Sequence, residues 1–399
     1  MLADRVKSLA PSSTLAVQAR AKELRARGVD VISFGAGEPD FDTPDRIKEA
    51  ATQAMRRGQT KYTEVGGIAE LRAAVVAKLR RDNELDYDPA EVVISCGAKH
   101  TLFNIVVALL NPGDEVLVPS PYWVSYPEQV RLIGGEPVAV PTAEATGFDL
   151  DPDRLRAAVT PRTKIIVLNS PNNPTGAVFS PAAVEAVARL AVDRKLWVIS
   201  DECYEALTFE GRHFSIAQLG SDVKARTIVV NTCSKAYAMT GWRIGYAAGA
   251  RDLIRAMTNV QSQVTSNPSS IAQWAAVEAL SGPQDEVAKM AGEFDRRRRF
   301  IVQGLNALPG VSCVMPKGAF YAFANVGALF GKPTTIGGVT RTLRGSADVT
   351  EFLLEHAQVA VVPGVDFGSD AHVRLSYATS FELIREGLHR MEAALRRLG

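Results

Sequence analysis

Cysteine is scarce in this sequence, long apolar runs are missing from it, and neither sign of charge is in excess. The four cysteines, Cys96, Cys203, Cys233 and Cys313, form no C-x-x-C pair, which argues against a disulfide scaffold or a zinc site and indicates a reducing compartment. No stretch of roughly 18 apolar residues occurs, so no membrane-spanning helix is expected. The N-terminal "MLADRVKSLAPSS" lacks the apolar stretch of a signal peptide. These absences predict a cytoplasmic protein with no membrane partner.

The charge balance restricts the kind of partner. Lys and Arg total 45 and Asp and Glu total 44, so no excess of positive charge favours nucleic acid. The run "DRRRR" at 295–299 is interpreted as a solvated or dimer-facing helix surface. The five histidines show no metal-ligand spacing, so we expect no metal site. A small molecule is therefore the expected partner.

The 399 residues, with 46% hydrophobic content, are long and apolar enough to predict two domains. From about 90 to 231, short β-branched runs alternate with amphipathic stretches, which predicts a mostly parallel sheet with helices on both faces. The predicted strands are "EVVIS", "PGDEVLV", "TKIIVLN", "LWVIS" and "RTIVVN", and the predicted helices are "KHTLFNIVVALL" and "PAAVEAVARLAVDRK". This pattern defines a large α/β domain.

The two ends of the chain predict a smaller α+β unit. A helix over 14–27 and the strand "DVISF" open the chain, and strands "GVSCVM", "FYAFANV", "VAVVP" and "HVRLSYA" mix with helices at 347–357 and from 380 near its end. A long helix over about 283–307 would connect the units. We expect an N-terminal segment and part of the small domain at 1–45, the large domain at 46–300, and the small domain at 301–399.

Polar side chains follow three predicted strands. "NSPNNPTG" with Asn173, "DECY" with Asp201 and Tyr204, and "NTCSK" with Lys235 come directly after the strands, where open parallel sheets bind ligands. "CGAK" is a glycine turn into a helix whose free N–H groups suit an anion. An amine, a carboxylate, a phenol, an amide and an anion cradle together match the needs of pyridoxal phosphate.

The order of motifs along almost the whole chain resembles the class I, fold-type I pyridoxal-phosphate aminotransferases, in particular the bacterial aspartate or aspartate/prephenate branch. The motifs are "GAGEPDFDTP", "KYTEVGG", "SPYWVSYPE", "NSPNNPTG", "DECY", "SKAYAMTGWRIGY" and "RLSYATS". The resemblance implies a large, mostly parallel sheet covered by helices, a smaller α+β domain built from both termini, pyridoxal 5′-phosphate as cofactor, and a homodimer with shared active sites.

The resemblance also implies roles for individual residues. Lys235 resembles the Schiff-base lysine, and burial and neighbouring cations would lower its pKa; the alternative is a surface lysine. Asp201 would hold the pyridine nitrogen protonated, with a helix N-cap as its alternative. Tyr204 and Asn173 would donate to the 3′ oxygen, although core packing is an alternative for Tyr204. Trp123 resembles the aromatic residue that stacks on the cofactor ring, against a core role.

For the phosphate, Arg243 resembles the binding arginine, because a guanidinium matches phosphate with parallel hydrogen bonds. Thr232 or Ser234 and the backbone N–H groups of Gly97, Ala98 and Lys99 would assist it. Tyr62 resembles a tyrosine that reaches the phosphate from the neighbouring subunit, and its alternative is a packed turn residue.

The substrate-binding residues implied are Gly37, Trp123, Asn173 and Arg374. Arg374 would bind the α-carboxylate bidentately, and Gly37 would let the backbone approach the substrate. The implied reaction transfers an amino group from L-aspartate to 2-oxoglutarate; prephenate or aromatic substrates are the alternative. No segment matches the second arginine of better-known branches, so Ser13 and Thr14 are candidates for the distal carboxylate, with an N-cap as their alternative.

Two other classes of function fit the residues less well. A hydrolase that uses Ser234 with Lys235 as its base lacks a G-x-S-x-G elbow. A cofactor-binding regulatory domain would need a DNA-binding region, and we find none before residue 14. "GAGEPD" also fails as a dinucleotide fingerprint, because Asp40, Pro39 and Pro44 interrupt it.

Overall fold

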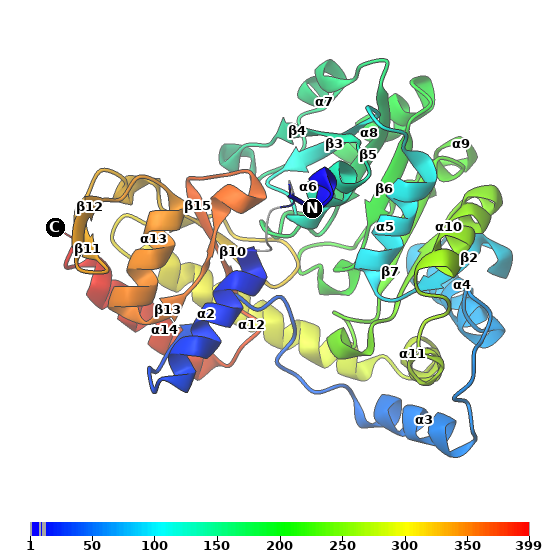
Figure 1. Ribbon diagram of the computed structural model, residues 1–399, viewed down its shortest axis with the longest axis horizontal. Coiled ribbons are helices and arrows are strands. Elements are labelled where there is room, and N and C mark those ends of the chain that lie inside the picture. Colours follow the sequence, from blue (N-terminus) through cyan, green and yellow to red (C-terminus); the bar gives the residue numbers. More distant parts are fainter. Residues whose placement is uncertain (1, 8, 10–12, 399) are drawn as a thin grey trace.

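The computed structural model describes residues 2–7, 9 and 13–398. A seven-stranded sheet forms the larger of two units (Figure 1). In spatial order its strands are β2 (Val92–Ser95), β8 (Gly245–Ala248), β7 (Thr227–Thr232), β6 (Trp197–Asp201), β5 (Thr163–Asn169), β3 (Glu115–Ser120) and β4 (Glu136–Pro141). The strands from β7 to β4 are parallel to one another, and β8 runs antiparallel to both β7 and β2. The predicted mostly parallel α/β sheet is confirmed.

Helices cover both faces of this sheet, which explains why its strands are nearly continuous apolar runs. Successive side chains of a strand point to opposite faces: Ile228 and Val230 pack in one apolar cluster, and Val229 between them packs in another. The helices of this unit are α3 (Asp45–Arg56), α4 (Ala69–Asn83), α5 (Ala98–Leu109), α6 (Ser125–Leu132), α7 (Pro152–Ala158), α8 (Pro181–Asp193), α9 (Ser221–Lys224), α10 (Arg251–Val264) and α11 (Ser270–Ser281). Ser180 caps α8 by accepting from the Ala183 N–H, and Pro181 fits the first helical position.

The smaller unit joins both ends of the chain. An antiparallel sheet has the order β14 (Val362–Pro363), β15 (His372–Ser376), β10 (Tyr321–Asn325) and β9 (Ser312–Cys313). The N-terminal β1 (Ile32–Ser33) pairs in parallel with β13 (Val359–Ala360), as the small-domain prediction requires. The remaining elements are the hairpin β11 (Pro333–Ile336) and β12 (Val339–Thr342), and the helices α2 (Ser13–Ala26), α13 (Ser346–Phe352) and α14 (Phe381–Leu395). The predicted helix at 347–357 ends in a π-helical turn over Leu353–Ala357.

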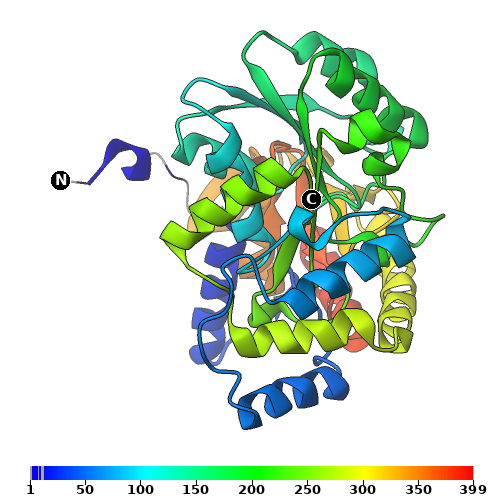
Figure 2. The ribbon, with the colours of Figure 1, turned by 90° about the vertical axis from the view of Figure 1, so that its right-hand side faces the viewer.

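The long helix α12 (Asp285–Ala307) contacts β9 and β10 of the small unit and the 3₁₀ turn Glu205–Leu207 of the large one (Figure 1). It therefore connects the units as predicted, while the domain boundaries themselves stay a prediction. The short α1 (Asp4–Lys7) stands away from the body of the molecule in the view of Figure 2. Within the described ranges, no helix has both the length and the apolarity that crossing a bilayer requires.

Candidate active site

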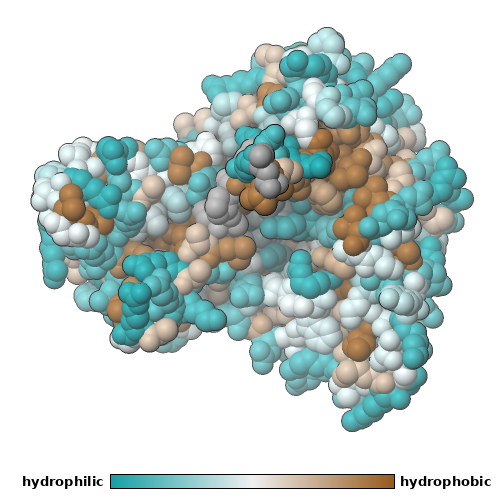
Figure 3. Space-filling model, viewed as in Figure 1, coloured by the Kyte–Doolittle hydropathy of each residue, from teal (hydrophilic) through white to brown (hydrophobic). Residues whose placement is uncertain are grey.

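A cavity of about 370 Å³ lies where the carboxyl ends of β5, β6 and β7 face the small unit. The space-filling view shows a hollow between the two units with hydrophilic residues at its floor (Figure 3). Twelve of the predicted site residues line this cavity: Gly37, Ala98, Lys99, Trp123, Asn173, Asp201, Tyr204, Thr232, Ser234, Lys235, Arg243 and Arg374. The structure thus brings together residues that are far apart in the sequence.

Lys235 follows β7 and extends into the cavity. Its Nζ donates a hydrogen bond to the carbonyl oxygen of Gly37 at 2.5 Å. Burial, aided by the positive charges of Arg374 and Arg243, lowers the pKa of the Lys235 amine to about 8, and Glu38 acts in the opposite direction. The predicted lowering of this pKa is confirmed, and an appreciable fraction of the amine is neutral near pH 7.5.

Asp201 ends β6, and its side chain is buried. The Tyr126 hydroxyl donates to Oδ2 at 2.5 Å, and the Cys203 N–H donates to Oδ1 at 3.2 Å. Burial raises the pKa of the Asp201 carboxyl, and these hydrogen bonds oppose the rise. Nowhere in the described part of the chain does a cationic side chain pair with Asp201. A buried carboxylate without a counter-charge is costly, so the site suits a ligand that places a cationic atom there.

Arg374, on β15, is only 1% exposed. Its Nη1 donates to Asn173 Oδ1 at 2.9 Å and its Nη2 to the Gly35 carbonyl at 3.0 Å, while Nε has no hydrogen-bond partner. Burial lowers the pKa of this guanidinium, and no carboxylate among the residues described forms an ion pair with it. The arrangement leaves a buried positive charge that an anionic ligand in the cavity would neutralise.

A third region of the cavity is built to hold an anion. Gly97 has φ +84° and precedes the first turn of α5, where the N–H groups of Ala98 and Lys99 are free to donate. A Cβ at Gly97 would lie 2.3 Å from Nη2 of Arg243, so only glycine lets the guanidinium lie against this turn. The hydroxyls of Thr232 and Ser234 meet at 2.9 Å nearby. Guanidinium, hydroxyl and helix N-terminus together suit a phosphate group.

Trp123 and Tyr62, two of the predicted aromatic residues, are placed differently. Trp123 lines the cavity, packs edge to face on Tyr126 with ring centroids 5.4 Å apart, and lies 4.9 Å from Nζ of Lys99. Tyr62 is 91% exposed and does not line the cavity of its own chain. The stacking role of Trp123 and the partner-subunit role of Tyr62 stay predictions.

Comparisons with known proteins agree with this geometry. The profile of the family "Aminotransferase class I and II" matches residues 29–391. This chain belongs to that family. It is 47% identical to the aspartate aminotransferase of Bacillus sp. strain YM-2 over 396 residues, 98% of each chain. It is 49% identical to the aspartate/prephenate aminotransferase of Thermus thermophilus over 399 residues, 99% of each chain.

Solved structures show the same similarity. The crystal structure of the Rhizobium meliloti aspartate aminotransferase is 45% identical, with a TM-score of 0.95, over 100% of this chain and 99% of that one. The aspartate aminotransferase of Thermus thermophilus with maleate is 48% identical, with a TM-score of 0.93, over 99% of this chain and 100% of that one. The chain is therefore an aminotransferase, an enzyme whose substrates are amino acids and oxo acids, and its fold is that of the aspartate aminotransferases.

Several residues at the site of this aminotransferase were missed in the sequence. Asn169, the last residue of β5, is the register partner of Asp201 and lines the cavity, so the rule applied to the other strand ends would have found it. Tyr126 lies one helical turn after Trp123. Tyr321 had no local signal, because only the fold brings it to Tyr204, where the two hydroxyls are 2.8 Å apart.

The structure also locates the residues suggested for the distal carboxylate and for hydrolase chemistry. Thr14 lines the cavity, whereas the side chain of Ser13 lies outside the described part of the molecule. Ser234 bonds to Thr232 and Lys235 to Gly37, so the serine and lysine of the hydrolase hypothesis are held by other partners.

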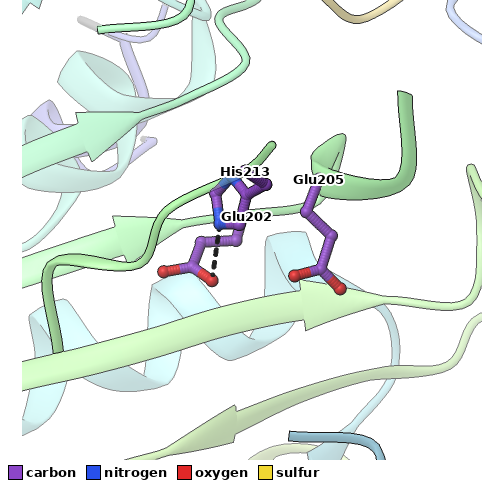
Figure 4. A group of neighbouring side chains, drawn as sticks. All are labelled: Glu202, Glu205 and His213. Carbon is purple, nitrogen blue, oxygen red and sulfur yellow. Dashed lines mark ion pairs between the residues drawn. The ribbon is translucent and has the colours of Figure 1, made fainter. Parts of the chain in front are cut away.

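A second polar cluster lies beside this site and has the composition of a metal site. Glu202, Glu205 and His213 bring their ligand atoms within 4.8 Å of one another (Figure 4). Glu202 already accepts from Ser200 and Ser215 and pairs with His213 at 3.0 Å, and Glu205 pairs with the ammonium of Lys78. Burial would lower the pKa of His213, but Glu202 raises it overall. Since its charges are neutralised internally, the cluster is better explained as a buried ion-pair network than as a metal site.

Proposed function

We propose that this aminotransferase uses pyridoxal 5′-phosphate to transfer the amino group of L-aspartate to 2-oxoglutarate, which gives oxaloacetate and L-glutamate. The observation that carries the proposal is the buried guanidinium of Arg374, which has no carboxylate partner in the described residues and shares a cavity with the amine of Lys235. An amino acid offers the carboxylate that the Arg374 guanidinium lacks, and its α-carbon would then lie between Arg374 and the Lys235 amine.

The residues of the cavity fit pyridoxal phosphate. The cofactor supplies an aldehyde that binds amines and a pyridinium ring that withdraws electrons from the substrate. Lys235 provides an amine, and the unpaired carboxylate of Asp201 provides the counter-charge for a protonated ring nitrogen. Tyr204 places a phenol at the cavity, and Arg243 with Ser234 and the start of α5 provides the phosphate site. Each part of the cofactor therefore has a chemically matched residue.

The protein's own groups would perform the remaining steps. Arg374 fixes the substrate by its α-carboxylate, and Asn173 holds Arg374 in place through Nη1. Lys235 Nζ, whose pKa of about 8 leaves part of it neutral, accepts the proton of the substrate α-carbon and returns a proton to the product side. Trp123 covers the cavity with an apolar face that excludes water.

The preference for dicarboxylates rests on a second cation. Lys99 lines the same cavity as Arg374, with its Nζ over the Trp123 ring. Burial and the charge of Arg243 lower the pKa of Lys99, so its ammonium would gain from an anionic partner. The Thermus thermophilus relative was solved with maleate, a dicarboxylate. Prephenate also carries two carboxylates, and the names of the aspartate/prephenate relatives support it as the alternative.

The homodimer and the cytoplasmic location belong to the same proposal. Tyr62 is a large, 91% exposed side chain on a segment that resembles the one reaching a neighbouring active site. Hybrid dimers test this: a protomer with Tyr62→Ala mixed with a protomer with Lys235→Ala would regain one intact site if the site is shared. Activity equal to that of the unmixed variants would contradict sharing.

Absorption spectroscopy tests the proposed reaction directly. The purified enzyme should show a visible band that aspartate removes and 2-oxoglutarate restores, and borohydride should fix the cofactor to the peptide that contains Lys235. Restoration by prephenate but not by 2-oxoglutarate would favour the alternative acceptor. An enzyme without a visible band after addition of pyridoxal phosphate would refute the proposed cofactor.

A further inference from the structure

Two buried phenols meet at the cavity. Tyr204 follows β6 and is 5% exposed, and Tyr321 begins β10 and is 1% exposed. Their hydroxyl oxygens are 2.8 Å apart, and either can be the donor. In the described ranges neither hydroxyl makes another hydrogen bond to protein. Each phenol has a single proton, so the direction of this bond decides whether Tyr204 keeps its own proton for a ligand.

The surroundings of the two rings favour one direction. The guanidinium carbon of Arg374 lies 4.5 Å from the centroid of the Tyr321 ring, a cation–π contact. Burial raises the pKa of both phenols, but the charge of Arg374 is the chief influence that lowers that of Tyr321, and it is a minor one for Tyr204. The phenol nearer the positive charge is the better donor, so Tyr321 should donate to Tyr204.

The backbone opposite leaves room for this arrangement. A Cβ at Gly37 would lie 2.9 Å from the hydroxyl oxygen of Tyr321, closer than carbon atoms normally approach. Gly37 is also the residue whose carbonyl accepts from Lys235. The absence of a side chain at Gly37 therefore lets the Tyr321 hydroxyl stay beside Tyr204, in the same region as the reactive amine.

We propose that Tyr321 is a positioning residue: it donates its hydroxyl hydrogen to Tyr204, which leaves the Tyr204 hydrogen for the 3′ oxygen of the cofactor, and its ring supports the guanidinium of Arg374. The inference rests on the proposed function, because it assigns an acceptor on pyridoxal phosphate to Tyr204. Tyr321 acts through Tyr204 and Arg374 and needs no contact with substrate.

Two substitutions separate the hydroxyl from the ring. Tyr321→Phe keeps the contact with Arg374 and removes only the donor. It should raise the pH midpoint at which the visible band of the cofactor-loaded enzyme changes by roughly 0.3 unit, since a chain of hydrogen bonds strengthens each bond only partly. The KM of amino acids should stay within about twofold of the wild-type value. Tyr321→Leu also removes the ring and should raise the KM of every amino acid roughly fivefold.

A double variant tests whether Tyr321 acts through Tyr204. In a Tyr204→Phe background, Tyr321→Phe should cause no further shift of the pH midpoint of the visible band, because Tyr204, which transmits the effect, has lost its hydroxyl. Tyr377→Phe is the matched control: this buried hydroxyl donates to the Ala319 carbonyl at 3.2 Å and is not part of the cavity, so its loss should not move the band. If Tyr321→Phe does not fold, 3-fluorotyrosine at 321 keeps the shape, strengthens the donor and should shift the pH downward.

The outcomes distinguish this inference from the proposed function. A wild-type enzyme that shows the visible band and the borohydride label at Lys235 establishes the cofactor independently of Tyr321. Given that result, an unchanged pH midpoint in Tyr321→Phe, or a shift of equal size in the Tyr204→Phe background, would overturn the role of Tyr321. The proposed function would stand.

Discussion

Replacing Arg374 by glutamine is the sharpest test of how the site binds substrates. The guanidinium is 1% exposed, two of its nitrogens are bonded to Asn173 and Gly35, and no carboxylate of the described chain neutralises it. Removing one partner of a buried, hydrogen-bonded charge pair costs roughly 2 to 5 kcal/mol. That cost corresponds to a rise of roughly 30-fold to several-thousand-fold in KM. Because every amino acid carries an α-carboxylate, the rise should be similar for aspartate, glutamate and phenylalanine.

The assay is steady-state kinetics, accompanied by the binding of maleate as an unreactive dicarboxylate and by thermal unfolding. Arg374→Lys keeps the charge but loses the fork of parallel donors, so it should recover only part of the affinity. Arg298→Lys is the matched control: it is equally buried, binds Asp295 and Glu210, and does not line the cavity. It should lower stability without changing KM. Unchanged KM values for all amino acids in Arg374→Gln, or a rise for dicarboxylates only, would refute the reasoning.

Other substitutions test single parts of the site. Lys235→Ala should abolish turnover and borohydride labelling while cofactor still binds non-covalently, as absorption after gel filtration would show. Lys99→Gln should raise the KM of aspartate and 2-oxoglutarate roughly two- to fivefold, because Lys99 is exposed and an exposed ion pair contributes roughly 0.5 to 1 kcal/mol, and it should leave the KM of phenylalanine nearly unchanged; an equal effect on phenylalanine would contradict the distal-carboxylate role. Tyr126→Phe removes a hydrogen bond that holds the Asp201 pKa down, so the acidic limb of the pH–activity profile should move to higher pH; an unmoved limb would contradict that coupling.

Most strands of the large sheet were predictable because the sheet is covered by helices on both faces. With helices on both faces, the centres of these strands, "IIVL" in "TKIIVLN" and "IVV" in "RTIVVN", must be apolar, and such runs are recognisable in a sequence. The antiparallel β8 was not predicted, because its four residues, Gly245–Ala248, are a glycine, a tyrosine and two alanines, too short a run to show a strand pattern. The pairing of β1 with β13 joins residues more than 300 positions apart, and no local property encodes it.

The same distinction holds within the site. Asp201, Tyr204 and Lys235 were predictable because each lies at the end of a strand, or just after it, where the strand faces the cavity. The pairing of Tyr204 with Tyr321 was not, because it depends on how β10 of the small unit lies against the large one. From the sequence alone, Asp201 could also have been a helix N-cap. In the structure its Oδ1 does accept a hydrogen bond from a nearby backbone N–H, that of Cys203. Its Oδ2, however, accepts from the Tyr126 hydroxyl across the site.

The lowered pKa of Lys235 has a consequence for stability, because the fold must keep a buried amine that the unfolded chain would protonate freely. The folded pKa is about 8 and the ordinary value 10.5, so between these pH values the unfolded state binds more protons and stability rises with pH. Below about pH 8 the penalty is fully present. Lys235→Met removes this penalty. Relative to the variant, the free energy of unfolding of the cofactor-free wild type should therefore rise by roughly 2 kcal/mol between pH 7 and pH 10. Urea unfolding of both proteins at the two pH values measures the difference and cancels the titration of all other groups. A difference that is independent of pH would mean that the amine is charged in the folded enzyme, and Lys235 would then be a poor acceptor for the substrate proton.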